Sequence, residues 1–292
     1  MQEPKFIWVI CGPTASGKTA MAIRLAQKLK TEILSADSRQ IYRELNIGVA
    51  RPEPEELAAV KHHFIASLSI AENYSAGRYA AEARAFAAAF LEQHRHLVVC
   101  GGTGLYLRAF LDGLDRKPAA AETRKALLER LWLEGLAALA AELSAINPDL
   151  ASETDLKNPQ RVVRALELAA SPEEPVPAAS KSLPENWQVR KFAPDLPREE
   201  LYARINRRCD EMLEKGLWEE ASALFENREL QALQTVGYRE IFDCLEGKIN
   251  RAEAIEKIKQ HTRNYAKRQL TWFRKDAQVQ WLKSTEVPDD FL

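Results

Sequence analysis

Short apolar runs and amphipathic stretches alternate along the first third of this chain. Ala20–Leu29 and Ala80–Gln93 have the periodicity of helices, and the second segment places Phe86, Phe90 and Leu91 at helical spacing. Short runs with the composition of buried strands are Phe6–Cys11, Glu32–Ala36, His62–Leu68 and His96–Cys100. Strands that alternate with helices predict a parallel sheet covered by helices.

The middle of the chain has a different pattern. Glu122–Leu143 is rich in Ala and Leu and predicts one or two helices. Asn158-Pro159 has the form of an N-cap followed by proline at the first helical position, and it opens a helix over Gln160–Ala170. The prolines within Ser171–Pro184 are typical of an irregular linker.

The last third returns to the sheet and then becomes helical. Trp187–Phe192 predicts a strand that rejoins the sheet, and from Arg198 the pattern is helical almost to the end. We therefore expect an α/β core made of residues 1–114 and 186–292, with a mostly helical insertion domain over residues 115–185 and a helical C-terminal part.

Composition narrows the class of protein. With 46% apolar and 28% charged residues, the chain can bury an ordinary globular core. Its cysteines include no Cys-x-x-Cys pair, which disfavours disulfides and a zinc site and indicates a reducing cytoplasm. No cationic leader precedes the first apolar run, and no run approaches the roughly 18 apolar residues of a membrane span. We expect a cytoplasmic protein with no membrane association.

A glycine-rich segment follows the first predicted strand. Gly12-Pro-Thr-Ala-Ser-Gly-Lys-Thr19 fits G-x-x-x-x-G-K-[ST] and leads into a helix, so backbone N–H groups and the helix N-terminus converge on one anion. Lys18 supplies a point charge, and Thr19 can hold Mg²⁺. A glycine turn with a surface lysine is the disfavoured alternative. The segment predicts a di- or triphosphate site and a P-loop NTPase-like sheet, but kinases, NTPases and some transferases share it.

Polar residues follow two of the other predicted strands. Asp37 comes after the second strand and Thr103 after the His96–Cys100 strand, so both should lie beside the phosphate loop. A carboxylate there can hold a metal through water or accept a proton from a nucleophile. Asp37 alone is also a plausible helix cap, and Thr103 a local turn hydroxyl.

The segment Arg251–Lys275 is strongly basic in a chain whose net charge is only −1. At about 100° per residue, one stripe and its flanks collect the cations Arg263, Lys267, Arg268, Arg274 and Lys275. The opposite side collects Ile255, Ile258, Tyr265, Ala266 and Phe273. Because no acidic residue follows Glu256 within this segment, RNA contact is favoured over a merely solvated helix face.

Several ordered motifs together resemble the tRNA dimethylallyltransferase family, from about residue 6 to residue 283. The motifs are Gly12–Thr19, Asp37–Tyr42, Gly101–Tyr106, Asn158–Glu167, Val236–Arg239 and Thr262–Arg274. The sequence departs from the family at Val49 and Arg51, where Thr and Lys are usual, at Ile65-Ala66, which lacks the usual acid, and at Ser171–Pro184, which replaces a glycine-lysine turn.

The resemblance implies roles for particular residues. Asp37 matches the family's base beside the adenine amine, and Thr103 the neighbouring hydroxyl. The diphosphate of dimethylallyl diphosphate, with Mg²⁺ at Thr19, would be bound by Gly12, Thr14, Ala15, Ser16, Gly17, Lys18, Thr19 and Arg208. Without the resemblance, Arg208 is a solvated charge on an amphipathic helix. Contacts to tRNA would map onto Ser38, Arg39, Gln40, Arg124, Gln160, Arg161, Arg164, Gly237, Tyr238, Arg239, Lys267, Arg268, Gln269, Trp272 and Arg274.

The function that the resemblance implies is a prenyl transfer. A monomeric enzyme would move a dimethylallyl group from dimethylallyl diphosphate to the N6 amine of the adenosine immediately 3′ of the anticodon, with the insertion domain contacting the tRNA anticodon stem-loop. The alternatives are an adenylate isopentenyltransferase acting on free AMP or ATP, a small-molecule P-loop kinase, and an RNA-binding protein with a vestigial loop. The basic segment Arg263–Lys275 weighs against the first two.

Overall fold

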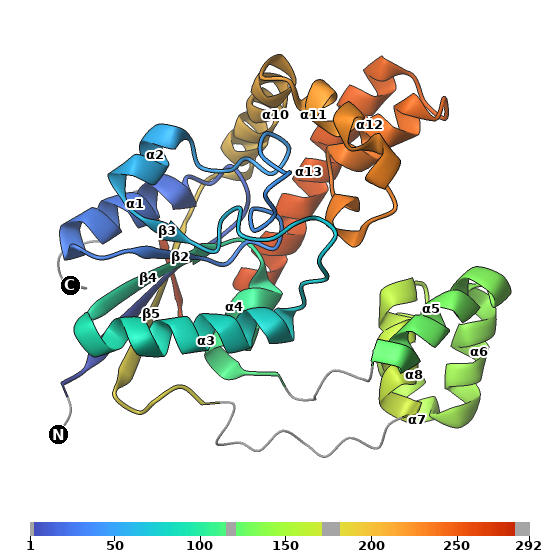
Figure 1. Ribbon diagram of the computed structural model, residues 1–292, viewed down its shortest axis with the longest axis horizontal. Coiled ribbons are helices and arrows are strands. Elements are labelled where there is room, and N and C mark those ends of the chain that lie inside the picture. The colour runs from blue at the N-terminus through green and yellow to red at the C-terminus, as the bar shows by residue number, and fades with distance from the viewer. Residues whose placement is uncertain (1–2, 115–120, 171–181, 284–292) are drawn as a thin grey trace. The chain divides into compact units, whose positions relative to one another are not determined.

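The computed structural model describes residues 3–114, 121–170 and 182–283. Its contacts divide the chain into two compact units. The first unit combines Met1–Leu111 with Leu183–Leu292, and the second is Asp112–Ser182. Figure 1 shows the elements of each unit in chain order by colour. Most of the linker expected at Ser171–Pro184 lies outside the described residues.

Within the described residues, the first unit contains a six-stranded, all-parallel sheet in the order β3-β2-β4-β1-β5-β6. Its strands are β1 (Lys5–Cys11), β2 (Ile33–Ser35), β3 (His62–His63), β4 (His96–Gly101), β5 (Trp187–Pro194) and β6 (Val279–Leu282). The helices before β5 in this unit are α1 (Lys18–Leu29), α2 (Pro54–Ala59), α3 (Ala76–Gln93) and α4 (Gly104–Asp112). The predicted parallel α/β fold is confirmed.

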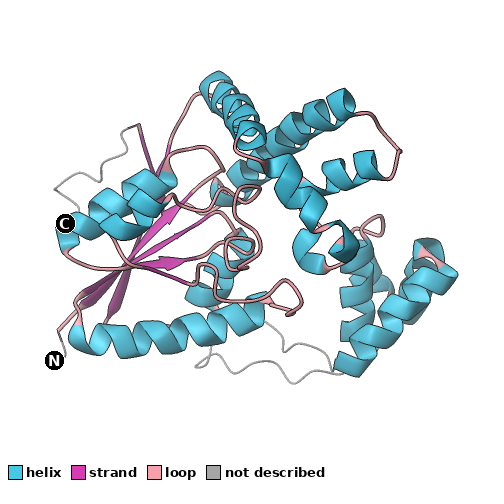
Figure 2. Cartoon of the chain, turned by 45° about the horizontal axis from the view of Figure 1, so that its top comes forward, coloured by secondary structure: helices cyan, strands magenta, loops and turns pink. Residues whose placement is uncertain are grey.

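Strand β1 lies near the centre of the sheet and is buried on both faces. Ile7 and Val9 pack with α3 and α4, whereas Trp8 and Ile10 pack with α1. Figure 2 shows helices on both sides of the sheet. Burial on both faces explains why this strand is continuously apolar instead of alternating.

The ends of the sheet differ from the sequence prediction. The strand expected at His62–Leu68 ends at His63, because Phe64 and Ala66 take positive φ angles of 62° and 49° that extended backbone does not allow. The C-terminal part was expected to be helical almost to its end, but β6 follows the last helix and pairs in parallel with β5. Four residues give too short a pattern to predict that strand.

The helices after β5 form a second core beside the sheet. They are α10 (Arg198–Glu214), α11 (Leu217–Ala223), the 3-10 turns η1 (Phe225–Asn227) and η2 (Gln231–Leu233), α12 (Tyr238–Leu245) and α13 (Arg251–Phe273). Asn250 begins α13 with a capping box that includes Glu253. Ile258 and Ala266 of α13 belong to this second core, while Phe273 at its end belongs to the core of the sheet. Helix α13 therefore joins the two cores.

The second unit is helical and has a core of its own. Its elements are α5 (Ala121–Glu134), α6 (Leu136–Ile146), α7 (Pro148–Glu153) and α8 (Pro159–Ala170). The stretch predicted as one or two helices is divided at Gly135, whose φ is 82°. Leu139, Leu143 and Val162 are fully buried inside this unit. No helix in the described ranges has the length and apolar character needed to cross a membrane.

Candidate active site

The phosphate loop lies between β1 and α1, at the carboxyl edge of the sheet. Gly12 and Gly17 have φ angles of 138° and 90°, which glycine adopts without strain, and Ala15 has a φ of 60°. Helix α1 begins at Lys18, inside the motif, so its first N–H groups face the loop. The Ser16 hydroxyl is 1% exposed and has no hydrogen-bond partner among the described residues. A buried donor without an acceptor is the feature expected of an anion site.

Lys18 and Arg208 bring two cations to this loop. Lys18 Nζ donates to the Pro13 carbonyl at 3.4 Å, and Arg208 Nη1 donates to Thr14 Oγ1 at 3.5 Å. Loss of solvent lowers the pKa of Lys18 and of Arg208. Neither forms a salt bridge with a carboxylate among the described residues. Since desolvated cations require a counter-charge, the pair favours binding of an anion.

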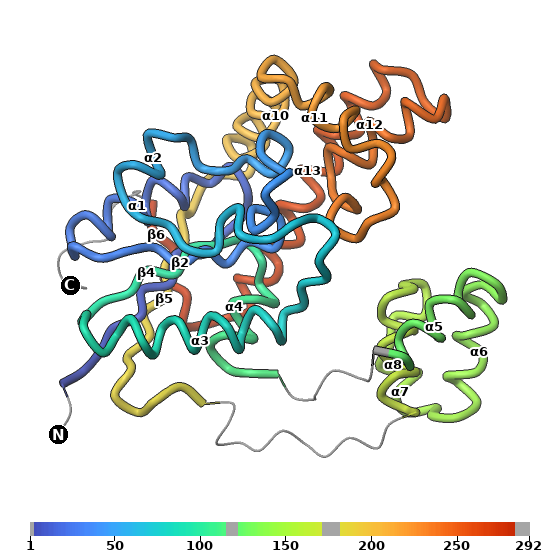
Figure 3. The backbone as a smooth tube through the Cα atoms, in the orientation of Figure 1, coloured from blue at the N-terminus to red at the C-terminus, as the bar shows by residue number. Residues whose placement is uncertain are grey.

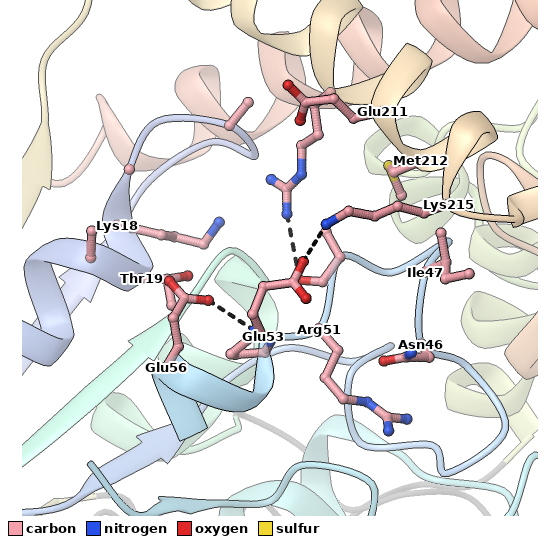
Figure 4. Close-up of a pocket in the computed structure, with 16 residues that line it drawn as sticks. Lys18, Thr19, Asn46, Ile47, Arg51, Glu53, Glu56, Glu211, Met212 and Lys215 are labelled. Atoms are coloured by element: carbon pink, nitrogen blue, oxygen red, sulfur yellow. Dashed lines mark hydrogen bonds and ion pairs between the residues drawn. The ribbon is translucent and has the colours of Figure 1, made fainter. Parts of the chain in front are cut away.

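Lys18 and Arg208 lie in the walls of two neighbouring cavities. The first, of about 500 Å³, is called here the acid-lined cavity because Glu53, Glu56 and Glu211 lie on its wall. Figure 4 shows Lys18 and Thr19 at its left and the Lys215–Glu53 ion pair at 2.6 Å near its centre. The second, of about 330 Å³, is called the Asp37 cavity. Residues that border both are Ala15, Lys18, Thr19, Ala50, Arg208 and Met212.

Asp37 and Thr103 come together at the ends of β2 and β4. The two strands pair in parallel, with Ser35 opposite Cys100, so the loops after them are neighbours. Thr103 Oγ1 accepts a hydrogen bond from the Ser38 N–H at 3.0 Å and donates to Ser38 Oγ at 3.3 Å. The carboxylate and the hydroxyl therefore lie on adjoining loops, as the order of strands and loops predicted.

Asp37 also acts as a local cap. Its Oδ1 accepts from the backbone N–H groups of Arg39 at 2.9 Å and Gln40 at 3.3 Å. The capping role considered for Asp37 is thus real, but turns and not a helix follow it. Figure 3 shows this backbone path between β2 and α2. With Oδ1 held in place, Oδ2 is the oxygen that can serve a ligand in the cavity.

Gln269 of α13 connects the phosphate loop to the loop after β4. Its Oε1 accepts from the Thr14 N–H at 2.9 Å, and its Nε2 donates to the Gly102 carbonyl at 2.9 Å. The side chain is 6% exposed, and both ends of its amide are occupied. The side chain of Gln269, expected to contact tRNA, thus holds two loops of the site together, and the residue also borders the Asp37 cavity.

Comparison with known proteins identifies the family. Residues 40–276 match the model of the IPP transferase family. A tRNA dimethylallyltransferase of Cytophaga hutchinsonii is 43% identical over 288 residues, which cover 98% of the chain and 95% of that relative. The chain belongs to the IPP transferase family.

Solved structures agree with this assignment. The full-length tRNA isopentenylpyrophosphate transferase of Bacillus halodurans superposes with a TM-score of 0.71 at 35% identity, covering 99% of the chain and 93% of that structure. A eukaryotic dimethylallyltransferase, in a structure described as acting on tRNA, gives a TM-score of 0.74 at 24% identity, over 98% of the chain and 75% of that structure. The second match supports the fold alone. The family resemblance seen in the sequence is confirmed.

Tyr265 is a site residue of this IPP transferase that the sequence pattern missed. It was expected on the packed side of α13, but it borders the Asp37 cavity. Burial of its side chain is the main cause that raises the pKa of Tyr265 to about 12, and the negative charge of Asp37 is the second. The spacing of Tyr265 along the helix could have predicted this position. Arg268 and Gln269, one turn further along, border the same cavity.

The Gly237–Arg239 motif is divided between surface and core. Tyr238 is fully buried, and its hydroxyl donates to Glu220 Oε1 at 2.5 Å. In this structure the side chain expected to contact tRNA packs in the core and holds Glu220. Gly237 and Arg239 border the Asp37 cavity, and Arg239 is exposed.

Other residues expected to contact tRNA lie around the same cavity. Ser38, Arg39 and Gln40 border it. Arg39 Nη1 donates to the carbonyls of Gln231 at 3.0 Å and Ala232 at 3.2 Å, which fixes its guanidinium against η2. The three residues thus lie on the cavity wall, and these contacts restrict the motion of Arg39.

Helix α13 has a basic exposed side, with one exception to the expected stripe. Lys267, Arg268, Trp272 and Arg274 are exposed, and Arg268 also borders the Asp37 cavity. Arg263 instead donates to Asn206 Oδ1 at 2.6 Å and faces α10. The predicted placement of Arg263 on the basic stripe is therefore wrong, because α10 packs against that side of the helix.

The second unit holds the remaining expected residues in one cluster. Glu167 is only 2% exposed and accepts from Arg124 Nη1 at 2.7 Å and Arg164 Nη1 at 3.0 Å. Arg124 Nη2 also donates to Gln160 Oε1 at 3.0 Å. Arg161 is 66% exposed, 3.8 Å from Asp155. Because Arg124 and Arg164 share one buried carboxylate, this cluster carries one excess positive charge.

The candidate metal ligand in this IPP transferase is Thr19. Among the described residues, no group of three or more His, Cys, Asp or Glu side chains is arranged to hold a metal ion. The Thr19 hydroxyl borders both cavities beside Lys18. A single hydroxyl next to an anion-binding loop fits Mg²⁺, which binds through few protein ligands together with phosphate oxygens and water.

Proposed function

We propose that this member of the IPP transferase family is a tRNA dimethylallyltransferase. It transfers the dimethylallyl group of dimethylallyl diphosphate to the N6 amine of the adenosine immediately 3′ of the anticodon and releases diphosphate. The observation that carries the proposal is the Asp37 cavity, where a carboxylate and the half-buried cations Lys18 and Arg208 border one space. The relatives named above support the choice of donor and of RNA.

The acceptor enters on the Asp37 side. An adenine amine is accessible only after the base leaves its stack, at a cost of a few kcal/mol. New stacking contributes roughly 1–3 kcal/mol per base and offsets that cost. Asp37 Oδ2 then accepts a proton from the amine as its nitrogen forms a bond to C1 of the prenyl group. Oδ1 stays bonded to the Arg39 and Gln40 N–H groups, so the base is preoriented.

The leaving group departs on the cation side. As the bond between C1 and the diphosphate oxygen breaks, negative charge grows on the diphosphate. Lys18, Arg208 and the loop N–H groups hold that charge without rearrangement, which stabilises the transition state. Thr19 would hold Mg²⁺, which neutralises part of the diphosphate charge when bound. The unpaired Ser16 hydroxyl supports an anion in this loop.

We propose that RNA is bound by residues of both units. In the first unit these are Ser38, Arg39, Gln40, Gly237, Arg239, Lys267, Arg268, Trp272 and Arg274. In the insertion domain they are Arg124, Gln160, Arg161 and Arg164. Phosphate contacts by such cations position the anticodon stem-loop without reading its sequence. The enzyme would act as a monomer in the cytoplasm, where tRNA is modified.

A substrate-choice experiment tests the proposal. Dimethylallyl diphosphate is supplied with an unmodified anticodon stem-loop, with AMP, or with ATP and no RNA, and products are identified by mass spectrometry. We expect prenylation of the stem-loop alone. Prenylation of AMP without the stem-loop would replace the proposal by an adenylate isopentenyltransferase, and phosphoryl transfer from ATP would replace it by a kinase.

A further inference from the structure

One carboxylate of α11 gathers donors from two distant segments. Glu220 Oε2 accepts from the N–H groups of Asn46 at 3.2 Å and Ile47 at 2.9 Å, and Oε1 accepts from the Gly48 N–H at 2.9 Å and the Tyr238 hydroxyl at 2.5 Å. Successive backbone N–H groups aimed at one anion form a nest, in which each hydrogen bond is strengthened by charge. Glu220 therefore fixes the start of the segment 46–52, called here the 46–52 loop.

Close packing reinforces the same attachment. A Cβ atom on Gly48 would lie 2.5 Å from the Tyr238 ring, so only glycine allows the loop to rest against that ring. Tyr238 is fully buried and has no room to move aside. The loop, the ring and the Glu220 carboxylate thus form one rigid contact.

The other end of the 46–52 loop is held by its own arginine. Arg51 Nη2 donates to the carbonyls of Tyr42 at 2.9 Å, Arg43 at 2.9 Å and Leu45 at 2.5 Å. The loop has no helix or strand to stabilise it, so these side-chain contacts determine its position.

The 46–52 loop connects Glu220 to the diphosphate end of the site. It borders both cavities, and its Ala50 carbonyl accepts from Arg208 Nη2 at 3.4 Å and Gln40 Nε2 at 2.9 Å. We propose that Glu220 is a positioning residue for the prenyl donor: through the loop, it sets where Arg208 meets the diphosphate. The identity of the donor rests on the proposed function, whereas the anchoring of a diphosphate anion does not.

The variant Glu220→Gln tests this role because it keeps the size of the side chain and removes its charge. We expect the Kd for inorganic diphosphate, measured by calorimetry, and the KM for dimethylallyl diphosphate to rise about tenfold, as expected when one charge-assisted hydrogen bond is weakened. The KM for the stem-loop should stay within about twofold, a split that general loss of folded protein would not produce. Glu219→Gln, a change at the neighbouring exposed acid, is the matched control and should leave both values unchanged.

Tyr238→Phe provides the second measurement. It removes one donor to Glu220 and keeps the ring against Gly48, so a smaller rise is expected, with an effect that is not additive with Glu220→Gln. If either variant is folded and binds inorganic diphosphate as tightly as the unaltered protein, the proposal is wrong. If Glu220→Gln does not fold, Tyr238→Phe alone decides. Diphosphate binding that depends on Glu220 in a protein that prenylates no RNA would uphold this inference and reject the proposed function.

Discussion

At the scale of single residues, Asp37 has two separate tasks. One oxygen caps the turn after β2, and the other is available to a ligand in the cavity. An asparagine retains an oxygen for the turn but cannot accept a proton at the second position. Substitution by asparagine therefore separates the structural task from the chemical one.

Asp37→Asn should lower the single-turnover rate of prenyl transfer by roughly 10²–10⁴-fold, the usual contribution of a general base. Binding of inorganic diphosphate should be little affected, because Lys18 and Arg208 are unchanged. Rapid-quench kinetics at saturating substrates measure the rate, and Glu92→Gln, at an exposed acid of α3, is the control. An unaltered rate would remove Asp37 from the chemistry.

The sequence allowed the residues that follow strands to be predicted, but not those on the packed sides of helices. Asp37 and Thr103 were expected to meet because the carboxyl ends of parallel strands share one edge. Periodicity assigns a residue to a side of a helix and does not say what that side meets. Tyr265 consequently borders the site without having been predicted there, Gln269 contacts the phosphate loop as well as the cavity where it was expected, and Arg263 faces Asn206.

At the scale of elements, α13 serves both the fold and the site. Its apolar residues join two cores, Gln269 reaches the phosphate loop, and the exposed side is basic. The short strands show the limit of local pattern. A strand was predicted from His62, but not its end after two residues, and β6 was not predicted at all; both strands depend on pairing with β2 and β5, and such long-range pairing leaves little signal in sequence.

Arg268→Ala and Arg274→Ala should each weaken binding of the anticodon stem-loop and flatten its salt dependence by about one unit of log Kd against log salt. Fluorescence titration over a range of salt concentrations measures both. Lys61→Ala is the control. Lys61 is exposed and precedes β3, which lies at the edge of the sheet opposite β6, the strand that follows α13. A slope identical to that of the unaltered protein would show that this side of α13 is only solvated.

At the scale of the whole molecule, the two units have separate cores. The phosphate loop and both cavities belong to the first unit, while the Glu167 cluster belongs to the second. A ligand that binds one unit stabilises that unit alone unless unfolding of the two is coupled.

Calorimetry should therefore show two unfolding transitions. Only the one with the larger enthalpy, which belongs to the first unit, should shift with inorganic diphosphate. At a concentration of 100 times Kd the first unit should gain about 2.7 kcal/mol. The stem-loop should shift both transitions if the insertion domain also binds RNA. A single transition that moves as a whole with diphosphate would contradict independent units.

The position of Gln269 next to Arg268 has a thermodynamic consequence. One residue reaches the amide of Thr14 in the phosphate loop, and its neighbour lies on the side of α13 offered to RNA. If binding of one substrate displaces α13, the Gln269 hydrogen bonds carry that displacement to the binding site of the other. Linkage then requires reciprocity: whatever factor RNA imposes on the affinity for the donor, the donor imposes on the affinity for RNA.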